Sequence, residues 1–299
     1  MTVRREARAK LNLRLRVLGR EESGYHAVET LMIGLALADL VSVERGPPGI
    51  RVVVDGENGV PEGPENLCWQ AAELLYRELD LSPAVVIRLE KRIPVSAGLG
   101  GGSMDAAAVL VALTELLERD PDPDRLIGLA GALGTDVPYG LCRGGLALGW
   151  ERGRRLMPLA APPSRPVLIA RPPFGIRAAD SYAWLARDRA GSGPPSDSVG
   201  ALPEAILIPE PAALTDWDVL GGLARNDLEG PVFRRHPELA ILRDALSDAG
   251  ARIALLCGSG ACVAGIFESE ECRDRAERAL QPTVGARLIR TSTLGPPAG

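Results

Sequence analysis

The sequence predicts an α+β fold in two domains, and three observations lead to this prediction. The 299-residue chain is 46% hydrophobic with ordinary charge content, so it can bury one large or two medium cores. Runs with the period of strands and runs with the period of helices alternate along it, most clearly after residue 238. A proline-rich stretch at residues 159–166 divides this pattern, so we expect domains at residues 1–158 and 159–299.

The first domain is expected to begin with strands. Apolar and polar residues alternate over residues 11–18, as they do in a strand with one buried face. Strand-like runs follow at residues 31–37, 40–44 and 49–55, with a turn at Gly46-Pro47-Pro48 between the last two.

The rest of the first domain mixes helices and strands. Apolar residues recur at helical spacing within residues 66–79. The same reasoning predicts a strand, two helices, a short loop or turn and a strand at residues 85–91, 104–118, 125–133, 135–138 and 146–150.

The second domain is expected to open with a strand at residues 167–170. Gly, Pro and Ser are abundant in residues 188–212, which predicts a mobile loop. A helix, two strands, a helix and a strand then follow at residues 238–249, 252–256, 262–267, 270–280 and 286–291. This order is typical of an α+β sandwich.

Composition excludes several classes of protein. A net charge of −5 argues against nucleic acid as a partner. No apolar run reaches the ~18 residues that span a bilayer, and the N-terminus lacks the apolar core of a signal peptide, so we expect a cytoplasmic protein with no membrane partner. The five cysteines are scattered and only two histidines accompany them, so we expect buried, reduced thiols and no zinc site.

The most informative segment is the glycine-rich stretch Pro94-Val-Ser-Ala-Gly-Leu-Gly-Gly-Gly-Ser-Met-Asp105. It lies between a strand-like and a helix-like run, an order that builds a phosphate-binding loop from backbone N–H groups and a helix N-terminus. Ser103 is expected at the helix start, where it can cap the helix or reach a metal ion. The pattern is neither a Walker A motif nor a Rossmann fingerprint. The alternative is a flexible linker.

A lysine and an aspartate could serve phosphoryl transfer beside this loop. Asp136, in Gly-Thr-Asp-Val-Pro, could accept the proton of an alcohol, and Lys10 could stabilise the developing charge. Only Lys10 and Lys91 are lysines among 34 basic residues, which suggests sites that need a compact ammonium group. On spacing alone, Asp136 could equally cap a turn and Lys10 could be a solvated charge.

Two further patterns remain ambiguous at this level. Cys257-Gly-Ser-Gly-Ala-Cys262 lies between two strand-like runs, so it is either a tight hairpin turn or a backbone wall near the phosphates. Gly24-Tyr25-His26 lies in a turn after the first strand, where Tyr25 offers an aromatic face and His26 a hydrogen-bonding group. Taken alone, a Tyr-His pair in a turn more often has a purely structural role.

Taken together, these motifs resemble the GHMP kinase family over nearly the whole chain. Pro94 to Met104 matches the family's Pro-x-x-x-Gly-Leu-Gly-Gly-Gly-Ser-Ser loop, except that Met104 replaces the second serine. The other similar segments are Ala9–Leu13, Gly24–His26, Pro64–Leu67, Gly134–Pro138, Asn226–Glu229 and Gly258–Gly260.

The resemblance implies a two-domain GHMP kinase fold. Its N-terminal domain resembles ribosomal protein S5 and carries ATP and catalysis, and its C-terminal domain is a ferredoxin-like α/β sandwich that closes the substrate cleft. The implied activity is ATP- and Mg²⁺-dependent phosphorylation of the 2-hydroxyl of 4-diphosphocytidyl-2-C-methyl-D-erythritol, a small CDP-linked substrate of the non-mevalonate (MEP) isoprenoid route.

Two alternatives to this activity stay open. One is another small-molecule kinase of the family, acting on mevalonate or homoserine. The other is a non-catalytic nucleotide-binding regulator, which the presence of Lys10 and Asp136 argues against. The oligomeric state is expected to be a monomer or a homodimer.

The resemblance also implies roles for single residues. Lys10 and Asp136 would be the catalytic pair, and Asn66 would border the adenine. Asn12, Tyr25, His26 and Tyr182 would bind the CDP-linked substrate, with the two tyrosines stacking on cytosine. The ATP phosphates would be held by Pro94, Val95, Ser96, Ala97, Gly98, Leu99, Gly100, Gly101, Gly102, Ser103 and Met104.

Three positions depart from the family pattern. Met104 removes a hydroxyl from the end of the loop, so contact with Mg²⁺ there would depend on Ser103 or on phosphates and water. Asp105 stands where asparagine or aspartate is usual. Arg177-Ala178 replaces a Ser-Thr-like pair ahead of Tyr182.

Overall fold

A long antiparallel hairpin forms the centre of the first sheet. The computed structural model describes residues 1–20, 26–57, 59–142, 145–150, 155–191, 210–281 and 285–296. Strand β1 (Thr2–Arg20) pairs with β2 (His26–Arg45) along nearly its whole length. The predicted break between residues 37 and 40 is wrong, because β1 pairs with this part of β2 as well and keeps it in one strand.

The remaining strands complete a seven-stranded sheet of order β3-β4-β2-β1-β8, with β5 and β6 branching from β2. They are β3 (Gly49–Asp55), β4 (Ala84–Glu90), β5 (Leu146–Trp150), β6 (Arg155–Leu159) and β8 (Arg225–Asn226). The sequence analysis misses β6. Pro158 interrupts the alternation of apolar and polar residues that a strand shows. A strand that contains proline is nevertheless tolerated at the edge of a sheet, and β6 lies at such an edge, paired with β5.

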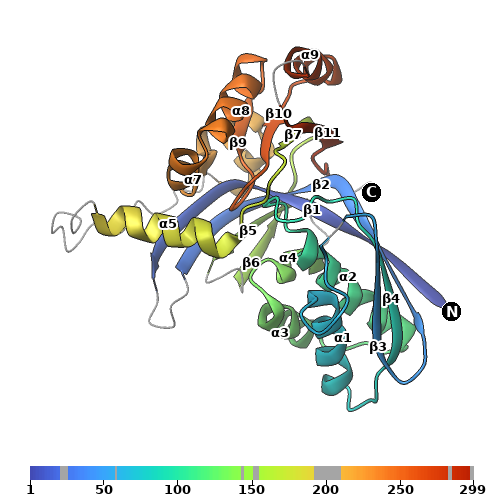
Figure 1. The fold of residues 1–299 in the computed structure, drawn as a ribbon. Coiled ribbons are helices and arrows are strands. Elements are labelled where there is room, and N and C mark those ends of the chain that lie inside the picture. The colour runs from blue at the N-terminus through green and yellow to red at the C-terminus, as the bar shows by residue number, and fades with distance from the viewer. Residues whose placement is uncertain are drawn as a thin grey trace.

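Four helices cover one face of this sheet: α1 (Leu67–Glu78), α2 (Gly101–Leu116), α3 (Pro123–Leu133) and α4 (Val137–Leu141) (Figure 1). Their apolar faces form a core with strands β2 to β4, and α2 is buried almost along its whole length. The sequence analysis predicts a short loop or turn at residues 135–138, whereas the structure has helix α4 there. Pro138 of α4 is compatible with this, because proline is tolerated in the first turn of a helix. Helix α2 begins three residues earlier than predicted.

The second sheet is antiparallel, with order β11-β7-β10-β9. Its strands are β7 (Pro166–Arg171), β9 (Ile253–Leu256), β10 (Val263–Ile266) and β11 (Arg287–Ser292). The main helices of this part are α5 (Ala178–Gly191), α8 (Pro237–Asp248) and α9 (Glu270–Leu280). The order of strands and helices along the chain gives a ferredoxin-like arrangement, which confirms the predicted fold class.

Several short elements between α5 and α8 are not predicted. They are the 3₁₀ helix η1 (Pro211–Thr215), α6 (Trp217–Leu223) and α7 (Glu229–Arg235). They are too short to show a helical period, although Asp216 caps α6 with its side chain. Helix α5 extends into the loop predicted at residues 188–212, and most of that range lies outside the described residues.

The two sheets share one apolar core. Leu11 and Leu13 of β1 belong to the same buried cluster as Val167 of β7 and Leu255 of β9. In addition, β8 pairs in parallel with β1, so a segment from the second half of the sequence joins the first sheet. The division at residues 158/159 therefore stays a prediction: β6 ends at Leu159 and β7 begins at Pro166, but the packing is continuous across it.

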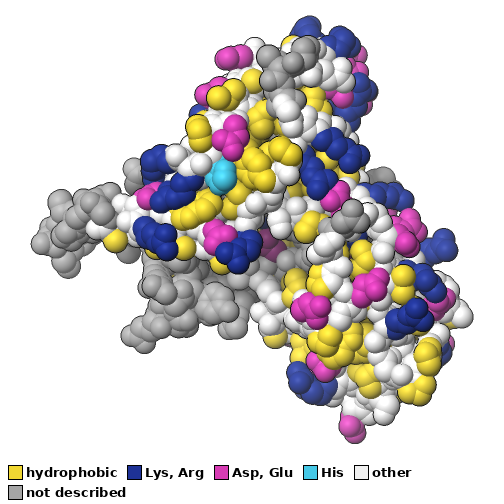
Figure 2. Space-filling view, in the orientation of Figure 1, with side chains coloured by type: hydrophobic (Ala, Val, Ile, Leu, Met, Phe, Trp, Pro, Cys, Tyr) yellow, Lys and Arg dark blue, Asp and Glu magenta, His cyan; other side chains and the backbone are white. Residues whose placement is uncertain are grey.

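Three features of the surface and the cysteines bear on the other predictions. Acidic and basic side chains intermingle on the face shown in Figure 2, with no single basic patch. No helix within the described part of the chain is both long and apolar enough to cross a membrane. All five cysteines are free thiols; Cys68, Cys257 and Cys262 are buried, whereas Cys142 and Cys272 are only half-buried.

Candidate active site

The glycine-rich loop connects β4 to α2 in a conformation that needs glycine. Gly98 has φ +77°, and a Cβ there would lie 1.7 Å from the carbonyl oxygen of Cys257. Gly100 has φ +74° and immediately precedes α2. Because both positions favour glycine, the loop can turn sharply into the helix and approach neighbouring backbone closely.

The loop forms the floor of a pocket of about 340 Å³, and the surface is hollowed between the part of the molecule with α8 and the part with α1 and α2 (Figure 2). Ten consecutive residues of the predicted phosphate loop, Pro94 to Ser103, line this pocket together with residues from the start of α1 and of α5. The N-terminus of α2 opens into it, and no side chain caps that end. Uncapped N–H groups and the helix dipole together favour an anion here.

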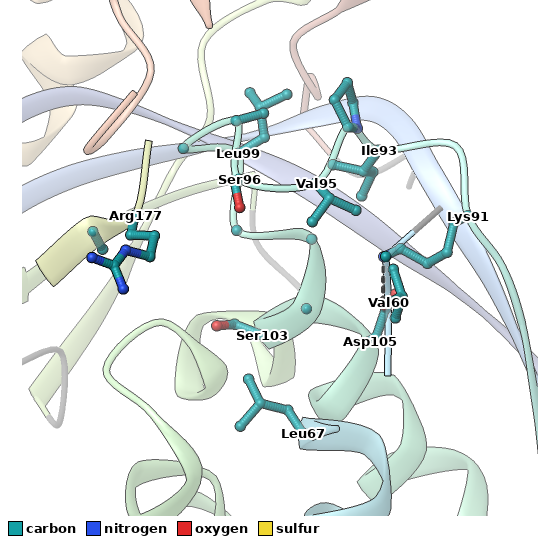
Figure 3. A pocket seen from close by; sticks show the side chains of 18 of the residues that line it. Val60, Leu67, Lys91, Ile93, Val95, Ser96, Leu99, Ser103, Asp105 and Arg177 are labelled. Carbon is teal, nitrogen blue, oxygen red and sulfur yellow. Dashed lines mark hydrogen bonds and ion pairs between the residues drawn. The ribbon is translucent and has the colours of Figure 1, made fainter. Parts of the chain in front are cut away.

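The end of the loop differs from the prediction in two ways. Ser103 lies in the first turn of α2 and does not cap it, because Gly100 holds the capping position. Its hydroxyl faces the pocket (Figure 3). Met104 does not line the pocket: its side chain is buried in the core and its backbone N–H donates to Gly100. The replacement of serine by methionine therefore affects core packing.

Asn66 borders the same pocket and begins α1. Its Oδ1 accepts from the N–H of Cys68 at 2.8 Å, and its Nδ2 donates to the carbonyl of Pro61 at 2.6 Å. Both contacts fix the wall of the pocket formed by residues 59–67. Val95 lies across the pocket from Leu67 (Figure 3), and its exposed side chain makes this end of the pocket partly apolar.

A buried charged cluster that the sequence analysis does not identify lies at the edge of this pocket. Lys91 is buried and donates to both Asp39 and Asp105, and Asp39 also accepts from the backbone N–H of Ile93. Burial raises the pKa of Asp105 to about 7, against the opposing charge of Lys91 and with Asp39 adding to the rise. The cluster ties β2, the end of β4 and α2 together beneath the loop.

Lys10 and Asp136 lie together in a second, adjacent pocket of about 230 Å³. The Nζ of Lys10 is 3.1 Å from an Oδ atom of Asp136 and donates to Oδ1 of Asn12 at 2.6 Å. Lys10 is buried, whereas the Asp136 side chain is 31% exposed and so remains accessible to a ligand. Gly98, Gly100, Ala178 and Ser259 line both pockets, which places the lysine–aspartate pair beside the glycine loop.

Irregular pairing in β1 positions this lysine. Lys10 and Asn12 lie two residues apart and so project from the same face of the strand. Shifts in the β1–β2 register occur on both sides of them, and such bulges redirect side chains near active sites. The N–H of Lys10 donates to the carbonyl of Leu99 at 3.0 Å, which joins the strand to the glycine loop. Asn12 in turn donates to Thr30, a supporting residue that sequence reasoning misses.

Of the predicted base-binding residues, the structure places Tyr182 in the second pocket. It lies there with Lys10 and Asp136, while its ring also packs against the core of the second sheet. Burial raises the pKa of the Tyr182 hydroxyl, and the charge of Asp136 adds to the rise. Tyr25 lies outside the described residues, and His26 is described only as the first residue of β2.

The segment Cys257–Cys262 is both a hairpin turn and a wall of the site. It connects β9 to β10, and the N–H groups of Ala261 and Cys262 donate to the carbonyls of Ser96 and Ala97. Asn226 holds it from behind, because its Nδ2 donates to the carbonyl of Gly258 at 2.6 Å. The two alternatives left open by the sequence are therefore compatible.

No group of three or more His, Cys, Asp or Glu side chains in the described part of the chain could hold a metal ion by itself. Mg²⁺ in phosphate-transfer sites is commonly held by few protein oxygens together with the phosphates. The Ser103 hydroxyl lines the first pocket and the Asp136 carboxylate lines the second, adjacent one, so these two oxygen ligands fit a metal held in that way.

Two family profiles match the sequence of this chain. The profile described as "GHMP kinases N terminal domain" matches residues 66–144, and "GHMP kinases C terminal" matches residues 210–286. The chain is 42% identical over 279 residues to a 4-diphosphocytidyl-2-C-methyl-D-erythritol kinase from Synechococcus sp. (strain JA-3-3Ab), a match that covers 92% of this chain and 88% of the relative.

Solved structures give the same result. A crystal structure of 4-(cytidine 5'-diphospho)-2C-methyl-D-erythritol kinase, 37% identical, superposes with a TM-score of 0.74 over 98% of this chain and 99% of that one. A homoserine kinase from Cytophaga hutchinsonii ATCC 33406 superposes with a TM-score of 0.72 over 99% and 95% of the two chains. At 18% identity, that second likeness shows the fold alone.

Proposed function

The chain belongs to the GHMP kinase family, and we propose that it transfers the γ-phosphoryl group of ATP to the 2-hydroxyl of 4-diphosphocytidyl-2-C-methyl-D-erythritol in the non-mevalonate isoprenoid route. The observation that carries this proposal is the pair of adjacent pockets. One is lined by an anion-binding glycine loop, and the other contains the Lys10–Asp136 pair. The choice of substrate follows from relatives of that name that match nearly the whole chain.

ATP would occupy the first pocket. The adenine would lie between Asn66 and Val95, and the phosphates would lie on the backbone of residues 94–103 at the N-terminus of α2. Met104 is omitted from the proposed contacts because its side chain is buried in the core.

The acceptor hydroxyl would lie beside Asp136 in the second pocket. The Asp136 carboxylate takes the hydroxyl proton as the acceptor oxygen forms its bond to the γ-phosphorus, while the bond from that phosphorus to the bridging oxygen breaks and ADP leaves. Lys10 stabilises the negative charge that develops on the acceptor oxygen, since its ammonium group is fixed 3.1 Å from Asp136. Asn12 orients the lysine.

Mg²⁺ would be held mainly by the nucleotide phosphates, with Ser103 and Asp136 as the nearby oxygen donors. When bound, it neutralises phosphate charge during transfer.

The cytidine end of the acceptor would stack on Tyr182, with Tyr25 on its other face. Every base has a π-face, so stacking alone does not select cytosine. His26 is the candidate for hydrogen bonding to the edge of the base.

A coupled ADP-release assay against a small panel of acceptors tests the proposal. We expect turnover with 4-diphosphocytidyl-2-C-methyl-D-erythritol and none with mevalonate or homoserine. Turnover of either alternative acceptor in place of the CDP-linked one would overturn the choice of substrate, and no turnover with any acceptor would favour a binding role. We further propose a cytoplasmic monomer or homodimer, which light scattering on the purified protein would distinguish.

A further inference from the structure

We propose that Arg177 binds the terminal phosphates of the nucleotide from the side of the pocket opposite Lys91. The inference rests on the proposed function, because it takes the first pocket as the nucleotide site. Arg177 is the residue immediately before α5 and lines this pocket. Its side chain lies across the pocket from Lys91 (Figure 3), and its guanidinium group donates to Asp180 of α5.

Contacts with the glycine loop fix the backbone from which Arg177 extends. The N–H of Ile176 donates to the carbonyl of Ser96 at 3.3 Å. One residue earlier, a Cβ on Gly175 would lie 2.6 Å from the Cβ of Ser96, so the two segments are in close contact. At the start of α5, the hydroxyl of Ser181 donates to the carbonyl of Ser259 at 2.8 Å. Arg177 is therefore held over the loop from both sides.

Among the described residues that line the two pockets, the distribution of charge leaves Arg177 as the cation most available to a phosphate. Lys91 is buried between two carboxylates, and Lys10 is paired with Asp136. Arg177 is 81% exposed, and its partner Asp180 lies one helical turn further along α5, at 2.8 Å. An exposed pair of this kind contributes little stability. A phosphate can displace Asp180, because the planar guanidinium group matches two phosphate oxygens at once.

The position of Arg177 indicates which phosphates it binds. The next residue, Ala178, lines both pockets, so it marks the junction where the γ-phosphoryl group passes to the acceptor. Arg177 lies on the nucleotide side of this junction and lines the first pocket. It therefore contacts the β- and γ-phosphates, where negative charge gathers on the bridging oxygen as the bond to the γ-phosphorus breaks.

Calorimetric titration of ATP, ADP and AMP into the full-length protein, without acceptor, tests this role. Replacing Arg177→Ala should weaken ATP binding about 10- to 100-fold, the range for a lost hydrogen bond to a charged group. ADP binding should weaken less and AMP binding should not change. Asp180→Asn should leave ATP binding unchanged or tighten it, because it removes the competing carboxylate. Arg187→Ala, an exposed arginine of α5 outside both pockets, is the matched control.

The opposite pattern would overturn the inference. If Arg177 only stabilised the start of α5 through Asp180, the Arg177→Ala and Asp180→Asn variants would weaken all three nucleotides alike. Unchanged ATP binding in a folded Arg177→Ala protein would also contradict it, while leaving the proposed function intact. Failure of the unaltered protein to bind ATP would instead contradict the proposed function.

Discussion

At the scale of single residues, the two lysines of this chain lie in separate environments of the same kind. Arginine supplies every other basic side chain, yet both lysines are buried and paired with aspartates. A compact ammonium group fits between closely spaced carboxylates where a broad guanidinium group does not. The scarcity of lysine in the sequence therefore indicated both positions, although it could not show that Lys91 contributes to structure and Lys10 to the proposed chemistry.

The proposed general base gives the first prediction. Asp136→Asn keeps the shape of the side chain and removes the proton acceptor, so kcat should fall at least ~10²-fold while ATP affinity is nearly unchanged. Steady-state kinetics and nucleotide titration on the same preparation measure both quantities. A variant with near-normal kcat would exclude Asp136 as the base.

The second prediction concerns the shape of Lys10. Its side chain is 5% exposed, and its Cε lies against Gly100, so there is little room for a larger group. Lys10→Arg keeps the charge but should lower kcat by at least ~10-fold, because the guanidinium group cannot occupy the same point between Asp136 and the acceptor. A melting curve is the control for folding. Full activity in Lys10→Arg would show that any cation suffices.

At the scale of elements, the glycine loop depends on some glycines more than others. Gly98 has a left-handed φ and no room for a Cβ, whereas a Cβ on Gly102 would meet only Leu67 at 3.9 Å. Gly98→Ala should therefore destabilise the protein by more than ~1 kcal/mol, while Gly102→Ala, within a helix, should be neutral or stabilising. Chemical denaturation of the two variants measures this. Equal stabilities would contradict the geometry of the loop.

The buried cluster beneath α2 predicts a dependence of stability on pH. The pKa of Asp105 is raised from 3.8 to about 7, so at pH values between these the unfolded chain loses a proton that the folded chain keeps. This group therefore lowers stability as the pH rises through that window. Asp105→Asn removes the effect. From pH 5 to pH 8 its stability should improve relative to the parent by roughly 1–3 kcal/mol, measured by urea denaturation. Parallel pH profiles would refute this.

These elements also show how far the sequence could be interpreted. The order of strand, glycine loop and helix was readable because glycine spacing and apolar period are local features. The exact start of α2 was not, because it depends on the backbone of Gly100. Thr30 and Asn226 support the site through contacts with residues distant in sequence, and no local pattern marks them. Asp39 was likewise missed. The sequence analysis placed it in a break between two strands, whereas pairing with β1 keeps β2 continuous through it.

At the scale of the whole molecule, the site is assembled from segments across the sequence. Lys10 comes from the first strand, the glycine loop and Asp136 from the middle, and Tyr182 and the Cys257–Cys262 turn from the second half. These segments stay together because β1 and β2 of the first sheet pack against strands of the second sheet in one shared apolar cluster. The composition-based division into two domains is useful for describing the fold, but the apolar packing does not separate there.

This shared core predicts that the two sheets unfold together. Leu13 of β1 is fully buried in the cluster that joins them. Leu13→Ala should therefore lower the stability of the whole molecule by about 2–5 kcal/mol, with one transition seen alike by far-ultraviolet circular dichroism and tryptophan fluorescence. The matched control is Ile241→Ala on α8, whose side chain is 67% exposed and whose loss should cost less than ~0.5 kcal/mol. Two separate transitions, with Leu13→Ala shifting only one, would mean that the sheets are independent folding units and that the cluster between them is an interface.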